Sequence, residues 1–206
     1  AAQTVSGMPD GRTIQFGWLR NNLKGMPFNC MLSVPNELSL KKVDGRPALC
    51  LWPAREVDAL RGEAYGERTC ELPGQSADVL IGFDADFTLN AFGIGIFYDA
   101  ARLALRVEDK EMRVSGGGAA GFRILVDVSC VEVYAQDGLD YAAFAAEAQP
   151  GNTVITLEGD VALYLAFAIL AGVIGGFLSV MMRWELQEPG IQIFHGLAAM
   201  VYGFEG

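Results

Sequence analysis

The stretch Arg123-Ile124-Leu125-Val126-Asp127-Val128-Ser129-Cys130-Val131-Glu132-Val133-Tyr134-Ala135-Gln136-Asp137-Gly138 decides the fold of this chain. It holds two apolar runs on either side of a short polar break, and a turn-forming Asp-Gly pair ends it. In the second run, residues 131–135, apolar side chains alternate with Glu132 and Tyr134. Such alternation is typical of a half-buried strand, so the stretch predicts two strands, the second with Glu132 and Tyr134 on its polar side.

Short runs of the same kind recur on both sides of this stretch, between turn signals such as Asp44-Gly45 and Pro150-Gly151. The other candidate strands are residues 12–19, 49–51, 79–83, 93–98, 103–107, 141–148 and 154–157. Residues 54–60 form the one helical stretch that we expect between strands. Many short strands separated by turns predict an all-β fold, an antiparallel β-sandwich.

Composition excludes several classes of protein. The 206 residues suffice for one sizeable domain with an appendage. A net charge of −10 argues against a basic surface for nucleic acid, so we expect no nucleic-acid partner. Hydrophobic residues make up 51% of the chain, which excludes a disordered protein.

The most hydrophobic segment is residues 161–182, which contain no charged side chain. As a helix this segment would be about 33 Å long, enough to cross the core of a bilayer. Arg183 and Trp184 follow it, as anchors at a membrane interface do. The sequence therefore predicts a C-terminal hydrophobic, transmembrane α-helix over 161–182. A buried helix of a soluble core is the alternative.

Residues that could carry metal or nucleophilic chemistry are few. The only histidine is His195, and the cysteines are Cys30, Cys50, Cys70 and Cys130. None of the cysteines forms a Cys-x-x-Cys pair, so we expect no zinc site, and their disulfide state stays open. One histidine leaves little room for a Ser-His-Asp or Cys-His mechanism. We expect no signal peptide, and the sequence assigns the chain no location.

Residues from about 10 to 160 resemble glycoside hydrolase family 32, the levanases, inulinases and invertases. The resemblance rests on Gly17-Trp18, on Gly25-Met26-Pro27-Phe28-Asn29, on Ser33-Val34-Pro35-Asn36-Glu37-Leu38-Ser39-Leu40, and above all on the stretch 123–138. The family pattern there reads roughly R-I-F-V-D-R-S-S-V-E-V-F-A-N-D-G. Val128 replaces an arginine of that pattern and Cys130 replaces a serine.

This resemblance implies a domain organisation and a function. Residues 1–32 would be the remnant of the last blade of a five-bladed catalytic propeller, 33–160 the β-sandwich, and 161–206 the hydrophobic helix and loop. The family uses a nucleophilic Asp and an acid/base Glu, whose motifs do not occur here, so no catalytic residue is expected. Trp18 matches an aromatic residue that lines the sugar pocket of relatives, and packing is its alternative role.

Residues from about 159 to 206 resemble the first transmembrane helix of haem-copper cytochrome c oxidase subunit I. The matching residues are Gly159–Gly172 and Arg183–Gln192. By this resemblance Arg183 would contact the low-spin haem, and Glu185 and Gly190 would belong to a Ca²⁺ or Na⁺ site. The haem and copper ligands lie on later helices, so we expect no redox function and no cofactor.

Three functions remain open at this stage. The first is a non-catalytic β-sandwich portion of a glycosidase that hydrolyses fructan or sucrose, supporting the missing propeller that binds the sugar. The second is a membrane-tethered carbohydrate-binding module that displays aromatic side chains, namely Trp52, Tyr65, Tyr98 or Tyr134. The third is a fragment of the oxidase subunit with an unrelated extension. The two resemblances meet at residues 158–163, and the origin of that join stays open.

Overall fold

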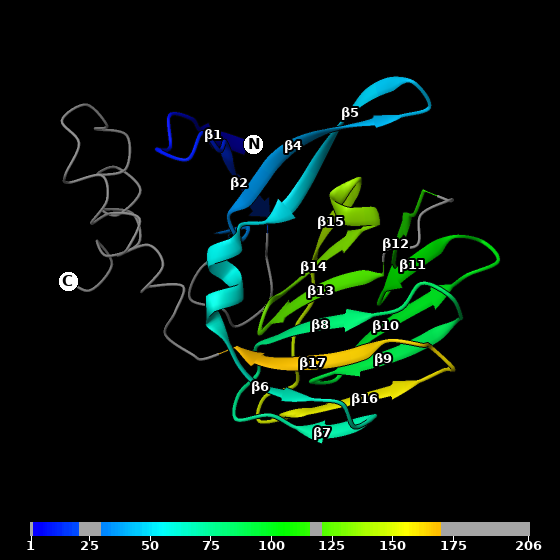
Figure 1. The fold of residues 1–206 in the computed structure, drawn as a ribbon. Coiled ribbons are helices and arrows are strands. Elements are labelled where there is room, and N and C mark those ends of the chain that lie inside the picture. The colour runs from blue at the N-terminus through cyan, green and yellow to red at the C-terminus, as the bar shows by residue number, and fades with distance from the viewer. Residues whose placement is uncertain (1, 21–29, 116–120, 170–206) are drawn as a thin grey trace, which may run out of the picture. The chain divides into compact units, whose positions relative to one another are not determined.

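The strands of the chain form three antiparallel sheets in the computed structural model, which describes residues 2–20, 30–115 and 121–169 (Figure 1). The N-terminal sheet has the order β1-β2-β4-β5, and β3 pairs with β2. Its strands are β1 (Ala2–Val5), β2 (Ile14–Arg20), β3 (Cys30–Leu32), β4 (Asn36–Val43) and β5 (Arg46–Pro53).

The hairpin of β4 and β5 shows how the sequence sets this local structure. Val43 pairs with Arg46, so the connection consists of Asp44 and Gly45 alone. Both connecting residues have positive φ, 49° and 81°. Two positive φ values define the turn whose twist matches that of the flanking strands, and Asp-Gly is its preferred sequence. The turn predicted at this position is confirmed.

The other two sheets are six-stranded and form the predicted β-sandwich. The first sandwich sheet has the order β12-β11-β10-β9-β16-β7 and the second the order β15-β14-β13-β8-β17-β6. Their strands are β6 (Arg61–Tyr65), β7 (Thr69–Glu71), β8 (Ala77–Ile81), β9 (Phe87–Ala91), β10 (Ile94–Asp99), β11 (Ala104–Val107), β12 (Lys110–Arg113), β13 (Phe122–Asp127), β14 (Cys130–Ala135), β15 (Asp140–Ala145), β16 (Val154–Glu158) and β17 (Tyr164–Ile169). Two short 3₁₀ helices, η1 (Arg55–Leu60) and η2 (Gln136–Gly138), complete the fold.

The core lies between the two sandwich sheets. It is one cluster of buried apolar side chains that both sheets supply, among them Val79, Ile81, Ile124 and Val133 from the second sheet and Leu89, Ile96, Leu105 and Ile155 from the first. Tyr98 packs in this core with its ring centroid 4.7 Å from that of Phe122. Burying this apolar surface is the main force that holds the two sheets together.

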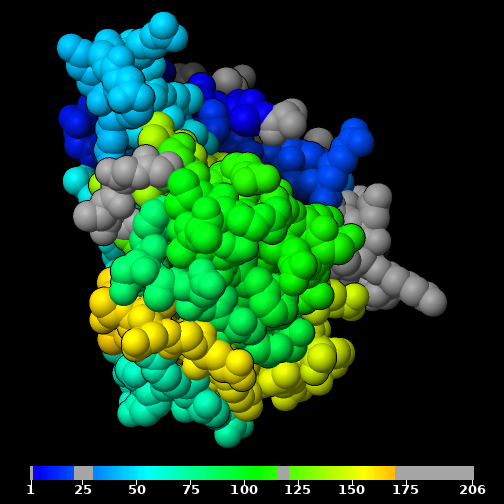
Figure 2. Space-filling model, turned by 90° about the vertical axis from the view of Figure 1, so that its right-hand side faces the viewer, coloured from blue at the N-terminus to red at the C-terminus, as the bar shows by residue number. Residues whose placement is uncertain are grey.

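The sandwich strands run from Arg61 to Ile169, whereas the sequence predicted a sandwich over residues 33–160. At the N-terminal side, β4 pairs with β2 and β5 pairs with β4, so these two strands complete the N-terminal sheet. Figure 2 shows that this sheet, in blue and cyan, lies against one end of the sandwich. η1 then leads from β5 into β6 and takes the place of the predicted helical stretch.

At the C-terminal side, the helix predicted from residue 161 is wrong for residues 164–169, which form β17. This strand pairs with β8 on one side and with β6 on the other. A short uncharged run suits a buried strand as well as a buried helix, and the partner strands decide between them. No helix within the described ranges is long and apolar enough to span a bilayer. Residues 170–182 of the predicted helix lie outside those ranges.

Candidate functional site

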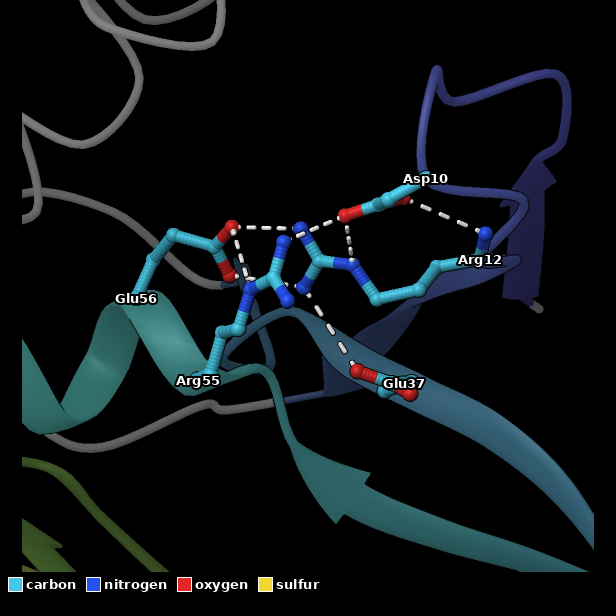
Figure 3. Close-up of polar contacts among 5 residues, drawn as sticks. All are labelled: Asp10, Arg12, Glu37, Arg55 and Glu56. Atoms are coloured by element: carbon cyan, nitrogen blue, oxygen red, sulfur yellow. Dashed lines mark hydrogen bonds and ion pairs between the residues drawn. The ribbon is translucent and has the colours of Figure 1, made fainter.

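A cluster of charged side chains joins the N-terminal sheet to η1 (Figure 3). Arg12 precedes β2, and its Nε donates to Asp10 Oδ2 at 2.6 Å. Its Nη1 donates to Glu56 Oε2 of η1 at 3.0 Å and lies 3.5 Å from Glu37 Oε2 of β4. Arg55 also pairs with Asp10. These five residues, the Arg12 cluster, tie together three segments that are far apart in the sequence.

The electrostatics of this cluster do not suit acid–base catalysis. The hydrogen bond from Arg12 lowers the pKa of Glu56, and the same contact raises the pKa of Arg12. Glu56 is therefore held ionised. Glycoside hydrolysis needs a carboxyl group that keeps its proton until it gives it to the leaving oxygen. A carboxylate bound to a guanidinium cannot serve as that acid, so the Arg12 cluster is a structural joint.

A second joint is buried within the second sandwich sheet. Asp78 of β8 and Arg123 of β13 are 0% and 2% exposed. Arg123 Nη2 donates to Asp78 Oδ2 at 2.7 Å, and Arg61 Nε reaches the same oxygen at 2.7 Å. Asp58 of η1 lies 2.7 Å from Arg123 Nη2. A buried charge is tolerated only when it is paired, so this network fixes η1 against the sandwich.

The third joint is a buried carboxylate, that of Glu132 in β14. Its Oε2 accepts hydrogen bonds from the hydroxyls of Tyr134 at 2.9 Å and Tyr141 at 2.7 Å. Its Oε1 accepts the backbone N–H of Val34 at 2.8 Å. Ser33, the preceding residue, accepts the N–H of Gly17 in β2. Glu132 therefore connects the sandwich to the segment between β3 and β4.

The turn after β14 brings the sandwich against the β4–β5 hairpin. Gln136, Asp137 and Gly138 all have positive φ, at 53°, 52° and 87°. A Cβ atom at Gly138 would collide with the carbonyl oxygen of Leu51, so only glycine permits this approach. Lys41 Nζ donates to the Asp137 carbonyl at 3.1 Å. The Asp-Gly pair predicted to end the strand thus also makes a contact between sheets.

A groove of about 320 Å³ lies between the N-terminal sheet and the second sandwich sheet. Its lining comes from β2, β3, β14 and β15 and consists of Trp18, Leu19, Arg20, Met31, Cys130, Ala143, Phe144 and Ala145. Trp18 is 44% exposed, so its indole is accessible at this groove. Burial raises the pKa of the Cys130 thiol, which therefore stays protonated and is a poor nucleophile.

The structure separates the aromatic residues that the sequence proposed for sugar binding. Tyr98 is 3% exposed and Tyr134 is 0% exposed, so the prediction that they are displayed to a glycan is wrong. Trp52 packs edge-on against Tyr134, and Tyr65 packs partly against the sandwich core. Of the aromatic residues considered, Trp18 alone among the described ones is largely exposed and lines a groove.

The remaining candidate residues lie outside the described ranges. They are Arg183, Glu185 and Gly190, which the oxidase resemblance connected with haem and a cation. All four cysteines are described, and each is a free thiol.

Sequence reasoning missed the residues that build the three joints. Asp78 and Arg123 each come directly before three successive apolar residues, and a charge beside an apolar run that does not alternate is a usable signal of a buried ion pair. Glu132 carries no such signal, because the alternation around it predicts exposure. It is 5% exposed because the segment before β4 covers it.

The comparisons with known proteins bear on the fold. No family model matches the chain. The fold is similar to that of fructosyl-bond hydrolases of glycoside hydrolase family 32. One is the exo-inulinase from Aspergillus awamori, with a TM-score of 0.62 and 15% identity over 82% of this chain. Another is the family 32 glycoside hydrolase from Bifidobacterium adolescentis, with a TM-score of 0.65 and 21% identity over 82%. The sucrose-6-phosphate hydrolase from Lactobacillus gasseri gives 0.60 and 19% over 83%.

These similarities cover only part of the solved enzymes. The chain spans 42% of the exo-inulinase, 31% of the Bifidobacterium enzyme and 41% of the sucrose-6-phosphate hydrolase. At such identities the likeness shows the fold alone. The described residues give no support to the oxidase resemblance, because residues 164–169 form a strand of the sandwich where that resemblance needs a helix.

Proposed function

We propose that this chain is the non-catalytic β-sandwich portion of a fructosyl-bond hydrolase, together with the last sheet of its catalytic propeller. The observation that carries the proposal is the pairing of β1, β2, β4 and β5 into an antiparallel sheet, bound to the sandwich by the buried Glu132–Val34 hydrogen bond and through η1 by Asp58 and Arg123. Four-stranded antiparallel sheets are the repeating blades of propeller folds. The sandwich would hold this blade in place, and the remaining blades would carry the two catalytic carboxylates.

The first test asks whether this chain alone hydrolyses fructosyl bonds. We expect the purified chain to release no fructose from sucrose, inulin or levan, because the carboxylates of the three joints are paired with arginines or held by tyrosines. Fructose release that scales with the amount of chain and disappears on heat denaturation would contradict the non-catalytic assignment.

The supporting role is tested in a longer product, translated from the gene together with any coding sequence ahead of residue 1. We expect that product to hydrolyse fructosyl bonds. A longer product that folds and hydrolyses none of the three sugars would overturn the proposal.

Within this function, we propose that Trp18 contacts the sugar. Its exposed indole and the neighbouring Arg20 face the groove, and an aromatic face beside a hydrogen-bond donor suits a neutral sugar ring. We expect the chain to be retarded in a native gel that contains inulin or levan, and the Trp18→Ala variant to migrate freely. Trp52→Phe is the matched control. Equal migration of the chain with and without the sugar would remove this assignment and leave the supporting role intact.

A further inference from the structure

Glu132 is a buried carboxylate at the contact between two parts of the fold. Its side chain belongs to β14 of the sandwich, and its Oε1 accepts the N–H of Val34, a residue 98 positions earlier in the chain. The hydroxyls of Tyr134 and Tyr141 occupy its other oxygen. Three donors therefore hold one carboxylate, and one of them lies in the segment that leads into the N-terminal sheet.

No described lysine or arginine pairs with this carboxylate. The nearest buried cation on the neighbouring strand, Arg123, is engaged by Asp78 and Asp58. The Asp127 carboxylate of β13 repels Glu132 and so adds to the cost of its charge. Asp127 is itself held by the hydroxyl of Ser76 and the N–H of Val128.

The titratable groups that face Glu132 stay neutral over the pH range in which a carboxyl group titrates. They are Cys130 and Tyr134 on its own strand and Tyr141 on β15, and burial raises the pKa of all three. The segment between β3 and β4 contributes Ser33 and Val34, β4 contributes Asn36, and β5 contributes Trp52 against Tyr134; none of these residues titrates. The local charge therefore depends on Glu132 and Asp127.

We propose that Glu132 is a proton-linked clamp: when its carboxylate takes up one proton, the arrangement in which the β3–β4 segment covers it becomes more stable. Relief of the buried charge outweighs the weakening of its three hydrogen bonds. The physical reason is the cost of keeping an uncompensated negative charge away from water. A protonated carboxyl still accepts the Val34 N–H, and its own O–H finds a tyrosine oxygen as acceptor. Protonation thus removes the buried charge without removing the contact.

The sign of the pH dependence follows from the environment. Burial raises the pKa of Glu132 above its ordinary value of 4.5. The folded chain therefore binds this proton more tightly than the unfolded chain does. The stabilisation is fully present below about pH 4.5, the unfolded value, and is lost as the pH rises through the raised folded value.

The direct test is a titration of the wild-type chain followed by NMR. The ¹³Cδ shift of Glu132 and the ¹H shift of the Val34 amide should change together, with one shared midpoint above 4.5. This measurement needs no variant, so it stands even if substitution of Glu132 prevents folding. A midpoint at or below 4.5, or an amide shift that does not follow the carboxyl, would overturn the proposal.

The second test compares Glu132→Gln with the wild type in urea denaturation between pH 5 and pH 8. Glutamine is neutral at every pH. The difference between the urea midpoints of the two proteins should therefore change with pH, because the wild type becomes less stable relative to the variant as the pH rises. Glu147→Gln, at an exposed position with no ion pair among the described residues, is the matched control and should keep a constant gap. A constant gap for Glu132→Gln as well would contradict the clamp.

Discussion

At the scale of single residues, the polar side chains that contribute most to the stability of the fold are the buried ones. Asp78 is 0% exposed and receives two guanidinium groups, from Arg61 and Arg123. Exposed ion pairs in the same chain, such as Lys41 with Asp137, contribute less to stability, because water competes with them. The burial of a charged side chain, more than its number of partners, therefore decides how much stability is lost when it is replaced.

We expect Asp78→Asn to lower the free energy of unfolding by about 3–5 kcal/mol, the usual cost of leaving a buried charge unpaired. The asparagine keeps the shape but leaves the buried Arg123 guanidinium with only the half-exposed Asp58 as its counter-charge. Urea denaturation followed by circular dichroism measures the loss. Asp109→Asn, at an exposed turn position, is the control and should change stability by less than about 0.5 kcal/mol. A loss as small as the control's would show that the network adds little.

The Arg12 cluster leads to a smaller, pH-dependent prediction. We expect Arg12→Gln to cost about 1 kcal/mol at pH 7, because the cluster is only partly buried. The pKa of Glu56 is lowered in the folded chain, so its pairing stabilises the fold above the unfolded value and is lost as the pH falls through the folded value. The difference in the free energy of unfolding between variant and wild type should therefore become smaller below about pH 4.

Urea midpoints at pH 7, 5 and 3 check this prediction. The control is Arg46→Gln at the hairpin turn, which has no ion pair among the described residues. A gap that widens on acidification would mean that Arg12 acts through something other than its carboxylate partners. The stabilisation by Glu56 is lost at low pH, whereas the stabilisation by protonated Glu132 is lost at high pH. The two contributions can therefore be distinguished in the same pH series.

At the scale of elements, β17 is the strand that completes the second sandwich sheet. It lies between β8 and β6, with Ala166 opposite both Val79 and Tyr65. Ala166 and Ala168 are 0% and 2% exposed. Without β17, β6 would have no partner strand in the sheet, and β8 would expose backbone groups and core side chains.

We therefore expect a chain that stops at residue 160 to lose cooperative folding. A chain that stops at residue 170, where the compact unit ends, should keep β-type circular dichroism and a sharp thermal transition. The pair differs by ten residues, so the comparison isolates β17. If the shorter chain has the same thermal midpoint as the longer one, β17 is dispensable and its pairing contributes no stability.

How far the sequence predicts these elements depends on the local pattern. The strand at 131–135 is predictable because alternation and the following Asp-Gly turn agree, and the strand at 122–126 because a short apolar run precedes a polar break. β17 is not, because an uncharged run lacks the polar residues whose spacing would reveal its period. The buried state of Glu132 is not predictable either, since its cover comes from Val34, far away in the sequence. Of the candidate site, Trp18 was named in advance, and the joints required the structure.

At the scale of the whole molecule, the three joints imply that the N-terminal sheet and the sandwich are one cooperative unit. Residues 1–170 group together as a single compact unit. We expect native-state hydrogen exchange to give the amides of β4 and β5 the same opening free energy as those of β13 and β14, because separation would leave the buried Glu132 without its Val34 donor. A plateau more than about 2 kcal/mol lower for β4 and β5 would show that the sheet opens alone.

The position of β17 also has a consequence for synthesis on the ribosome. β6 and β8 emerge from the ribosome well before the strand that fits between them, which is made only after β16. Until then the growing chain carries a sheet with a gap, and both sides of that gap present unpaired backbone and apolar side chains. Because the sheet closes only when β17 has been made, the nascent chain stays exposed to misassembly until then, and we expect a holding chaperone to raise the yield of native protein.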